Sequence, residues 1–139
     1  MTGTTPLSLP LSRSLPPVTR TDLALYAGAS GDHNPVHIDI DAARRAGLDD
    51  VIAHGMLSMA WAGRVLDEVA GPGSVQAYRM RFTAPVHIGD RLTVTVRGSE
   101  EEPTTDVEVQ VTDSEGAVKA RGTARLAPSA LSTARSRST

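Results

Sequence analysis

The stretch Tyr26–Ala60 reads YAGASGDHNPVHIDIDAARRAGLDDVIAHGMLSMA and carries most of the information in this chain. An acid, Asp32, and an imidazole, His37, stand at the two ends of a segment that contains an Asn-Pro pair. An Asn side chain stabilises a turn by bonding its own backbone, and Pro fixes φ, so this pair predicts a tight turn. The stretch ends on a His-Gly pair, His54-Gly55, that opens an apolar segment.

Capping residues predict helices on both sides of the turn. A first helix is expected to start near Thr19 or Thr21, where Thr can cap it, and to stop at Gly31. A short second helix can be capped by Asp39 or Asp41. A third helix should follow the His-Gly pair, since apolar and small residues then surround most of the segment up to about residue 69. Such a helix is buried for most of its length.

Beyond the third helix the hydrophobic period changes from helical to alternating. Four strands are expected, at Val75–Val86, Arg91–Arg97, Asp106–Thr112 and Ala117–Leu126. Apolar and polar residues alternate along these strands, so one face of the sheet is covered and the other is exposed to solvent. This pattern indicates antiparallel pairing. Helices followed by a meander of strands predict an α+β domain in which one buried helix packs on a curled sheet.

Length and composition indicate one soluble globular domain. The chain has 139 residues, 40% of them hydrophobic and 22% charged, which is enough for one core and too little for two ordinary domains. We assign the domain to residues 16–127. Residues 1–15 are expected to be a loose arm or an edge segment, and residues 128–139 a disordered tail.

Several classes of function are disfavoured by the composition. The net charge of −2 and the small number of aromatic residues do not favour binding to nucleic acid or to an anionic membrane. The chain has no cysteine, which removes thiolate nucleophiles and zinc–thiolate sites. No apolar run approaches a bilayer span, and the N-terminus lacks the features of a signal peptide. A cytoplasmic location is therefore expected.

Three blocks stand out in order along the chain, YAGASGDHNPVH at Tyr26–His37, IAHGML at Ile52–Leu57 and MRFTAPVHIGDRL at Met80–Leu92. In this order they resemble the MaoC-like, (R)-specific hydratase/dehydratase family of the hot-dog fold. Within the family, the Pro72–Val86 stretch is especially similar to the catalytic B-type subunit of actinobacterial 3-hydroxyacyl-ACP dehydratases. The resemblance implies a bent antiparallel sheet wrapped around a long buried central helix. It also implies a homodimer, or a heterodimer with a related subunit.

The resemblance implies reversible dehydration of (R)-3-hydroxyacyl thioesters, linked to CoA or to an acyl carrier protein, without a cofactor. Dehydration needs one proton removed beside the carbonyl and another delivered to the departing hydroxyl. By resemblance Asp32 is assigned to the carbon-side proton and His37 to the oxygen-side proton, a division that a coupled pair can reverse. Gly55 offers a backbone N–H at a helix N-terminus, where negative charge on a thioester oxygen is stabilised.

Five further residues are candidates for substrate binding or for support of the acid–base pair. Asn34 and His54 adjoin the pair in the motifs. Ser30 has a hydroxyl close by, although it does not lie in the G-x-S-x-G turn of a serine nucleophile. Arg79 and Arg81 lie two residues apart on one strand and therefore share a face. This face is either simply exposed to solvent, or its arginines bind the phosphates of CoA or a carrier arm.

Other interpretations of the same sequence remain open. His33 lies beside the pair at a spacing that metal ligands use, but the HExxH pattern is absent, so no metal is expected. The same fold can serve a polyketide-tailoring dehydratase or cyclase, or a thioesterase. A non-catalytic partner subunit of a heterodimer is the alternative outside the enzymes.

Overall fold

The computed structural model describes residues 9–98 and 105–128, and they form three α-helices, one 3₁₀ turn and one sheet. In chain order the elements are β1 (Leu11–Ser14), α1 (Arg20–Ser30), the 3₁₀ turn η1 (Pro35–His37), α2 (Ile40–Arg45), α3 (Gly55–Ala70), β2 (Val75–Phe82), β3 (Thr93–Gly98), β4 (Asp106–Thr112) and β5 (Val118–Leu126). The α+β class expected from the sequence is confirmed.

The predicted helix ends are present, with the chemistry that defines them. The Thr19 side chain accepts a hydrogen bond from the N–H of Asp22, whose carboxylate accepts from the N–H of Thr19, forming a capping box. Helix α1 then stops at Gly31, whose φ of 76° is left-handed. Asp39 caps α2 by accepting from the N–H of Asp41 at 2.9 Å.

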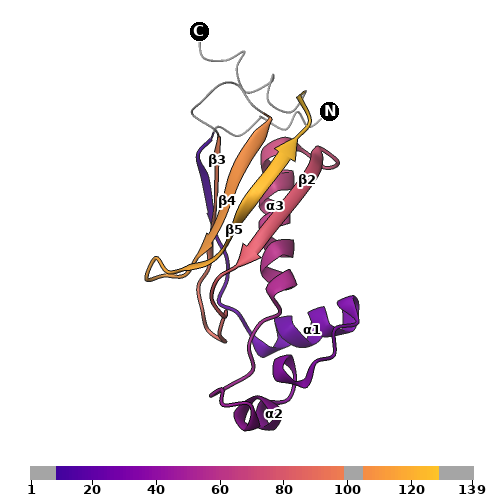
Figure 1. The fold of residues 1–139 in the computed structure, drawn as a ribbon, viewed down its shortest axis with the longest axis vertical. Helices are drawn as coiled ribbons and strands as arrows, with labels where there is room; N and C mark the ends of the chain where they lie inside the picture. The colour runs from indigo at the N-terminus through magenta and orange to yellow at the C-terminus, as the bar shows by residue number, and fades with distance from the viewer. Residues whose placement is uncertain (1–8, 99–104, 129–139) are drawn as a thin grey trace.

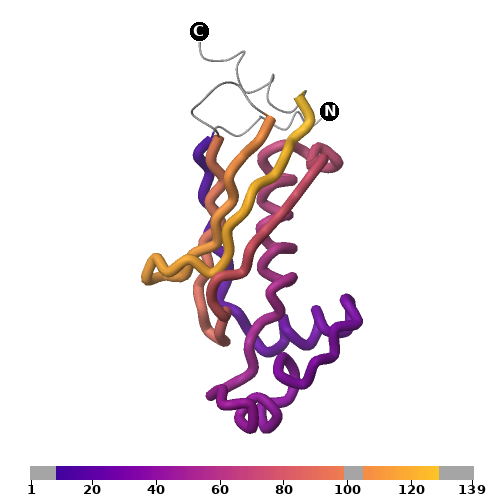
Figure 2. Tube along the Cα trace, viewed as in Figure 1, coloured from indigo at the N-terminus to yellow at the C-terminus, as the bar shows by residue number. Residues whose placement is uncertain are grey.

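The five strands pair in antiparallel fashion in the order β1-β3-β4-β5-β2. The expected simple meander is therefore wrong for β2, which pairs with β5 and not with β3. The segment between β2 and β3 is too long for a tight hairpin and passes round one end of the sheet (Figure 2). As a result β2 lies at one edge of the sheet with its outer side unpaired in the described chain.

Strand β2 is also shorter than the expected Val75–Val86, because it ends at Phe82. The N–H groups of Thr83 and Ala84 both donate to the carbonyl of Lys119, at 2.9 and 3.3 Å, which interrupts the ladder. Pro85 follows and has no N–H to continue it.

The opposite edge of the sheet is β1, which pairs with β3. Residues 1–15 were expected to form a loose arm or an edge segment, and Leu11–Ser14 forms an edge strand. Residues 1–8 and 129–139 lie outside the described residues, so the loose arm and the disordered tail stay predictions.

Helix α3 lies along one face of the sheet, whereas α1 and α2 gather at one end, near the start of α3 (Figure 1). The other face of the sheet carries no helix among the described residues (Figure 1). The core between α3 and the sheet is aliphatic. Its buried members include Leu57, Ala62, Val65, Leu66, Val69, Val94, Val96, Val107, Val109, Val111, Ala120, Ala124 and Leu126.

The expectation that α3 is buried for most of its length is wrong on one side. Met56 is 54% exposed and Ala60 is also exposed, because the single sheet covers only the opposite side of the helix. Phe82, on the neighbouring edge strand β2, is 44% exposed as well. None of the helices in the described residues combines the length and apolar character that a bilayer-spanning segment needs.

Candidate active site

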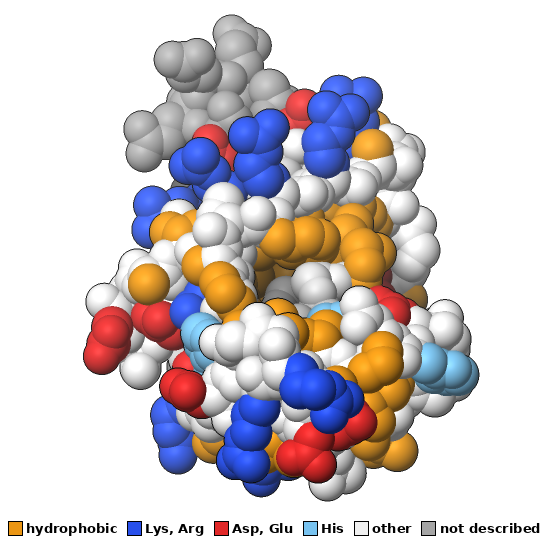
Figure 3. Space-filling view, turned by 60° about the horizontal axis from the view of Figure 1, so that its bottom comes forward, with side chains coloured by type: hydrophobic (Ala, Val, Ile, Leu, Met, Phe, Trp, Pro, Cys, Tyr) orange, Lys and Arg blue, Asp and Glu red, His pale blue; other side chains and the backbone are white. Residues whose placement is uncertain are grey.

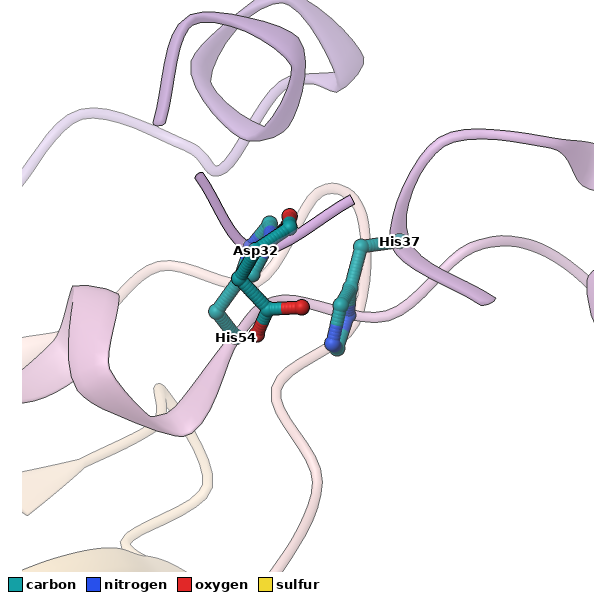
Figure 4. A group of neighbouring side chains, drawn as sticks. All are labelled: Asp32, His37 and His54. Carbon is teal, nitrogen blue, oxygen red and sulfur yellow. Dashed lines mark hydrogen bonds between the residues drawn. The ribbon is translucent and has the colours of Figure 1, made fainter. Parts of the chain in front are cut away.

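Asp32, His37 and His54 come together near the start of α3. Asp32 follows the left-handed Gly31 that ends α1, His37 closes η1, and His54 immediately precedes α3. One donor atom from each of the three side chains lies within 4.8 Å of the other two. Figure 4 shows the Asp32 carboxylate directed toward the His37 ring. The acid and the base that the sequence singled out are thus neighbours in space.

The turn that carries Asp32 is held by short-range hydrogen bonds. Ser30 Oγ accepts from the N–H of Asp32 at 3.1 Å. Asp32 Oδ1 accepts from the N–H of Asn34 at 3.2 Å, and Asn34 Oδ1 accepts from the N–H of Val36 at 3.2 Å. Ser30 and Asn34 therefore shape the backbone around Asp32, and Asn34 orients its carboxylate through a main-chain N–H.

The His37 ring is oriented by the main chain of the neighbouring loop. Its Nδ1 lies 2.6 Å from the carbonyl oxygen of Ile52. A carbonyl only accepts, so Nδ1 carries the proton and donates, and in the neutral ring Nε2 keeps its lone pair. The fold thereby selects the tautomer in which His37 can take up a proton at Nε2.

His54 supports both members of the pair. Its Nε2 donates to the main-chain carbonyl of Asp32 at 3.1 Å, and its ring stacks on that of His37 with centroids 3.8 Å apart. The Tyr26 ring makes an edge-type contact with the His54 ring, with ring centroids 4.8 Å apart at an interplanar angle of 66°. His54 is only 2% exposed, so this imidazole lies out of reach of solvent.

Two buried polar atoms in this region find no hydrogen-bond partner among the described residues, His54 Nδ1 and Ser58 Oγ. Ser58 lies one helical turn after His54 and is 2% exposed. Ser58 was not among the candidate residues that the sequence suggested. Ser58 is four residues after His54, and this helical spacing was the signal in the sequence that could have drawn attention to Ser58.

Gly55 presents the first N–H of α3, and within the described residues this N–H has no hydrogen-bond acceptor. The first N–H groups of a helix lack intrahelical partners and favour negative charge. The Phe82 ring packs directly over this glycine, since a Cβ at position 55 would lie 2.9 Å from Phe82 Cδ2. Close packing by Phe82 is a reason for glycine here that the sequence did not reveal.

The spacing in the cluster suits an acid–base pair that shares one oxygen atom. An oxygen placed between two groups separated by up to 4.8 Å can make a hydrogen bond of about 2.8 Å to each. A water molecule or a substrate hydroxyl fits this description. Figure 3 shows that the surface is hollowed at this end of the molecule and that hydrophobic side chains border much of the hollow.

The same three residues form a donor set of the kind that holds metal ions, but the rings do not converge. The planes of His37 and His54 are inclined by only 26° at a centroid separation of 3.8 Å. An ion about 2.0–2.1 Å from each ring nitrogen must lie close to both ring planes. Nearly parallel stacked planes do not meet at that distance, so this geometry favours proton transfer over metal binding.

Two of the candidate residues lie elsewhere. Arg79 and Arg81 are exposed on β2, whereas Tyr78 and Met80, which alternate with them, pack toward α3. The two arginines therefore point to the face of the sheet opposite the Asp32–His37 pair. The exposed His33 does not join the metal-type donor cluster in the described residues.

Comparison with known proteins identifies a matching family and several relatives. The sequence profile of the family described as MaoC like domain matches residues 4–119. An (R)-specific enoyl-CoA hydratase of Rhodospirillum rubrum is 41% identical over 81 residues, which are 57% of this chain and 56% of that protein. A 3-hydroxybutyryl-CoA dehydratase of Methylorubrum extorquens is 34% identical over 85 residues, 60% of this chain and 54% of that protein. The chain thus spans about half the length of the curated relatives it matches.

Solved structures resemble the fold over a larger share. The unliganded R-hydratase PhaJ1 from Pseudomonas aeruginosa superposes with a TM-score of 0.74 at 34% identity, covering 88% of this chain and 83% of that one. The (R)-hydratase from A. caviae superposes with a TM-score of 0.70 at 26% identity, covering 87% of this chain and 96% of that one.

Proposed function

The chain belongs to the MaoC-like family, and on this basis we propose that it interconverts (R)-3-hydroxyacyl thioesters and trans-2-enoyl thioesters. The observation that carries the proposal is the juxtaposition of Asp32 and His37, with the His37 tautomer set by the Ile52 carbonyl. The names of the relatives, an enoyl-CoA hydratase and a 3-hydroxybutyryl-CoA dehydratase, support the same reaction class.

In the hydration direction, neutral His37 removes a proton from water at Nε2 while the water oxygen bonds to the β-carbon of the enoyl thioester. The α-carbon receives a proton from the Asp32 carboxyl group. Dehydration is the reverse, with the Asp32 carboxylate taking the α-proton and the His37 imidazolium protonating the departing hydroxyl. One proton is thus shared by the pair throughout, and no redox step occurs.

The thioester carbonyl gains negative charge while the α-carbon is being protonated or deprotonated. In this proposal the N–H of Gly55 at the start of α3, which has no acceptor within the described residues, donates to that oxygen. Ser30, Asn34 and His54 take no proton in this scheme. They hold the Asp32 backbone and the His37 ring in place.

A second copy of the chain is the proposed partner. Among the described residues, strand β2 leaves one edge of the sheet unpaired, and an open edge is a liability that association covers. The exposed Met56 and Phe82 lie on the helix and the edge strand that adjoin this edge. Pairing through β2 would cover these apolar side chains and the exposed side of α3 together.

Product analysis with crotonyl-CoA tests the proposed reaction. We expect loss of the enoyl-thioester absorbance and formation of (R)-3-hydroxybutyryl-CoA, identified by mass and chiral chromatography. Free CoA and crotonate as the products would instead establish a thioesterase. If crotonyl-CoA is inert, the same assay with crotonyl bound to an acyl carrier protein decides whether the carrier is the missing element. Inertness of both substrates would refute the proposal.

A further inference from the structure

The helix-free face of the sheet carries a groove of about 650 Å³, a volume within the range of small-molecule sites. Its charged lining consists of four arginines and one glutamate, a net formal charge of +3 on a chain whose overall charge is −2. These residues are Arg79, Arg81, Arg97, Arg121 and Glu108. All five are exposed, and they come from all four of the strands β2 to β5.

The strand register places two of these cations directly opposite each other. Arg81 on β2 pairs with Arg121 on β5, and like charges in directly opposed positions destabilise a sheet. Elsewhere on the same face opposed charges have opposite sign. Asp106 faces Arg125, and a hydrogen bond of 2.8 Å joins them. Within the described residues no ion pair or side-chain hydrogen bond compensates Arg81 or Arg121.

We propose that this groove is a binding site for the phosphate group of a small organic phosphate. A phosphate between Arg81 and Arg121 would replace their repulsion by charge-assisted hydrogen bonds, which guanidinium groups make in bidentate form. Arg79 is two residues from Arg81 on the same face and adds a third cation. Thr123, opposite Arg79, contributes a neutral hydroxyl to the same lining. The site lies across the sheet from Asp32 and His37, so it does not depend on the catalytic proposal.

Calorimetric titration of the full chain tests this site with three probes, inorganic phosphate, 4′-phosphopantetheine and adenosine 3′,5′-bisphosphate. We expect at least one probe to bind, and Arg121→Ala to weaken that binding about tenfold or more, since hydrogen bonds to charged groups are among the strong ones. The matched control is Arg125→Ala on the same strand and face, whose charge is already compensated by Asp106. It should leave the dissociation constant unchanged.

The probe that binds identifies the source of the phosphate. Binding of adenosine 3′,5′-bisphosphate alone indicates the nucleotide end of CoA, and binding of 4′-phosphopantetheine alone indicates a carrier arm. Binding of all three indicates a site for the phosphate group itself.

A charge reversal gives a second, independent readout. Arg81→Glu should abolish binding and at the same time raise the midpoint of thermal unfolding, because it converts the opposed like charges into an opposite pair. The proposal is refuted if no probe binds the wild-type protein, or if Arg81→Glu and Arg121→Ala bind the probes as the wild type does. It is also refuted if Arg125→Ala weakens binding as much as Arg121→Ala does.

Discussion

The imidazole ring of His37 stacks on that of His54, with centroids 3.8 Å apart and planes inclined by 26°. The same His54 donates from Nε2 to the main-chain carbonyl of Asp32. One buried side chain therefore contacts both members of the acid–base pair, the base through its ring and the acid through its backbone. This contact fixes the position of the two groups relative to each other.

Replacing His54 should impair turnover more than substrate binding. His54→Gln keeps an N–H that can reach the Asp32 carbonyl but removes the ring on which His37 stacks. We expect kcat to fall about 10²-fold, since small misplacements of catalytic groups have effects of this size, with a much smaller change in KM. Steady-state kinetics with crotonyl-CoA measures both, and circular dichroism checks the fold. Wild-type kcat in a folded His54→Gln protein would show that the stacking has no positioning role.

The requirement for glycine at position 55 should depend on Phe82. Gly55→Ala retains the backbone N–H but brings a Cβ to 2.9 Å from Phe82 Cδ2, so the ring or the start of α3 must move. We expect kcat to fall about tenfold or more, because a displaced N–H no longer meets the thioester oxygen. The double variant Gly55→Ala/Phe82→Ala should recover most of the loss, with Phe82→Ala alone as the control. If the double variant is no better than Gly55→Ala, the glycine is needed for the approach of the substrate.

The phenol of Tyr78 should make the protein less stable at high pH. Burial raises the pKa of Tyr78 to about 12 from its ordinary 10.0, and its hydroxyl donates to the Met59 carbonyl of α3 at 2.8 Å. Between these two values the unfolded chain loses the phenolic proton while the native state keeps it. The free energy of unfolding therefore falls as pH rises from 10 to 12.

Tyr78→Phe should remove this part of the pH dependence. It should also lower the free energy of unfolding below pH 10 by about 1 kcal/mol, through loss of the hydrogen bond. Urea unfolding of both proteins from pH 8 to 12 measures the two effects. Parallel curves for the two proteins across this range would contradict the assignment.

Ser58→Ala should stabilise the protein. Ser58 Oγ is buried without a hydrogen-bond partner among the described residues, and an unsatisfied buried hydroxyl costs about 1–3 kcal/mol. We expect a higher free energy of unfolding in urea and unchanged kcat. A loss of stability would mean that the hydroxyl is satisfied, for example by a buried water.

Local chemistry made much of the fold predictable from the sequence. The capping box at Thr19, the left-handed Gly31 and the start of α3 at Gly55 all depend on residues within a few positions of each other. Alternating valines likewise predicted β4 with its observed bounds. Features of this kind need no knowledge of distant parts of the chain.

Features that depend on distant contacts were predicted less well. The end of β2 at Phe82 is set by the Lys119 carbonyl on another strand. The exposed side of α3 at Met56 is as apolar as the buried side, so the pattern alone could not show that the sheet leaves it uncovered. Arg79 was known to share a face with Arg81, but only the position of α3 shows which face that is.

In the candidate site too, features set by neighbouring residues were predictable and features set by distant contacts were not. Asp32 and His37 lie within one local turn, and the sequence identified them together. His54 comes from a different segment, and its stacking on His37 depends on how the loop before α3 folds back. Phe82 reaches Gly55 from the edge strand, which no local pattern indicates.

The most direct test of the central claim is the rate of crotonyl-CoA hydration by Asp32→Asn and His37→Ala, each compared with a matched control. The controls are Asp49→Asn and His33→Ala, which alter exposed side chains of the same types outside the cluster. We predict that the two cluster variants lose at least about 10²-fold in kcat, as expected for positioned acid–base groups, and that all four proteins keep wild-type secondary structure. Near-normal turnover by either folded cluster variant, or an equal loss in its control, would contradict the assignment of Asp32 and His37 as the acid–base pair.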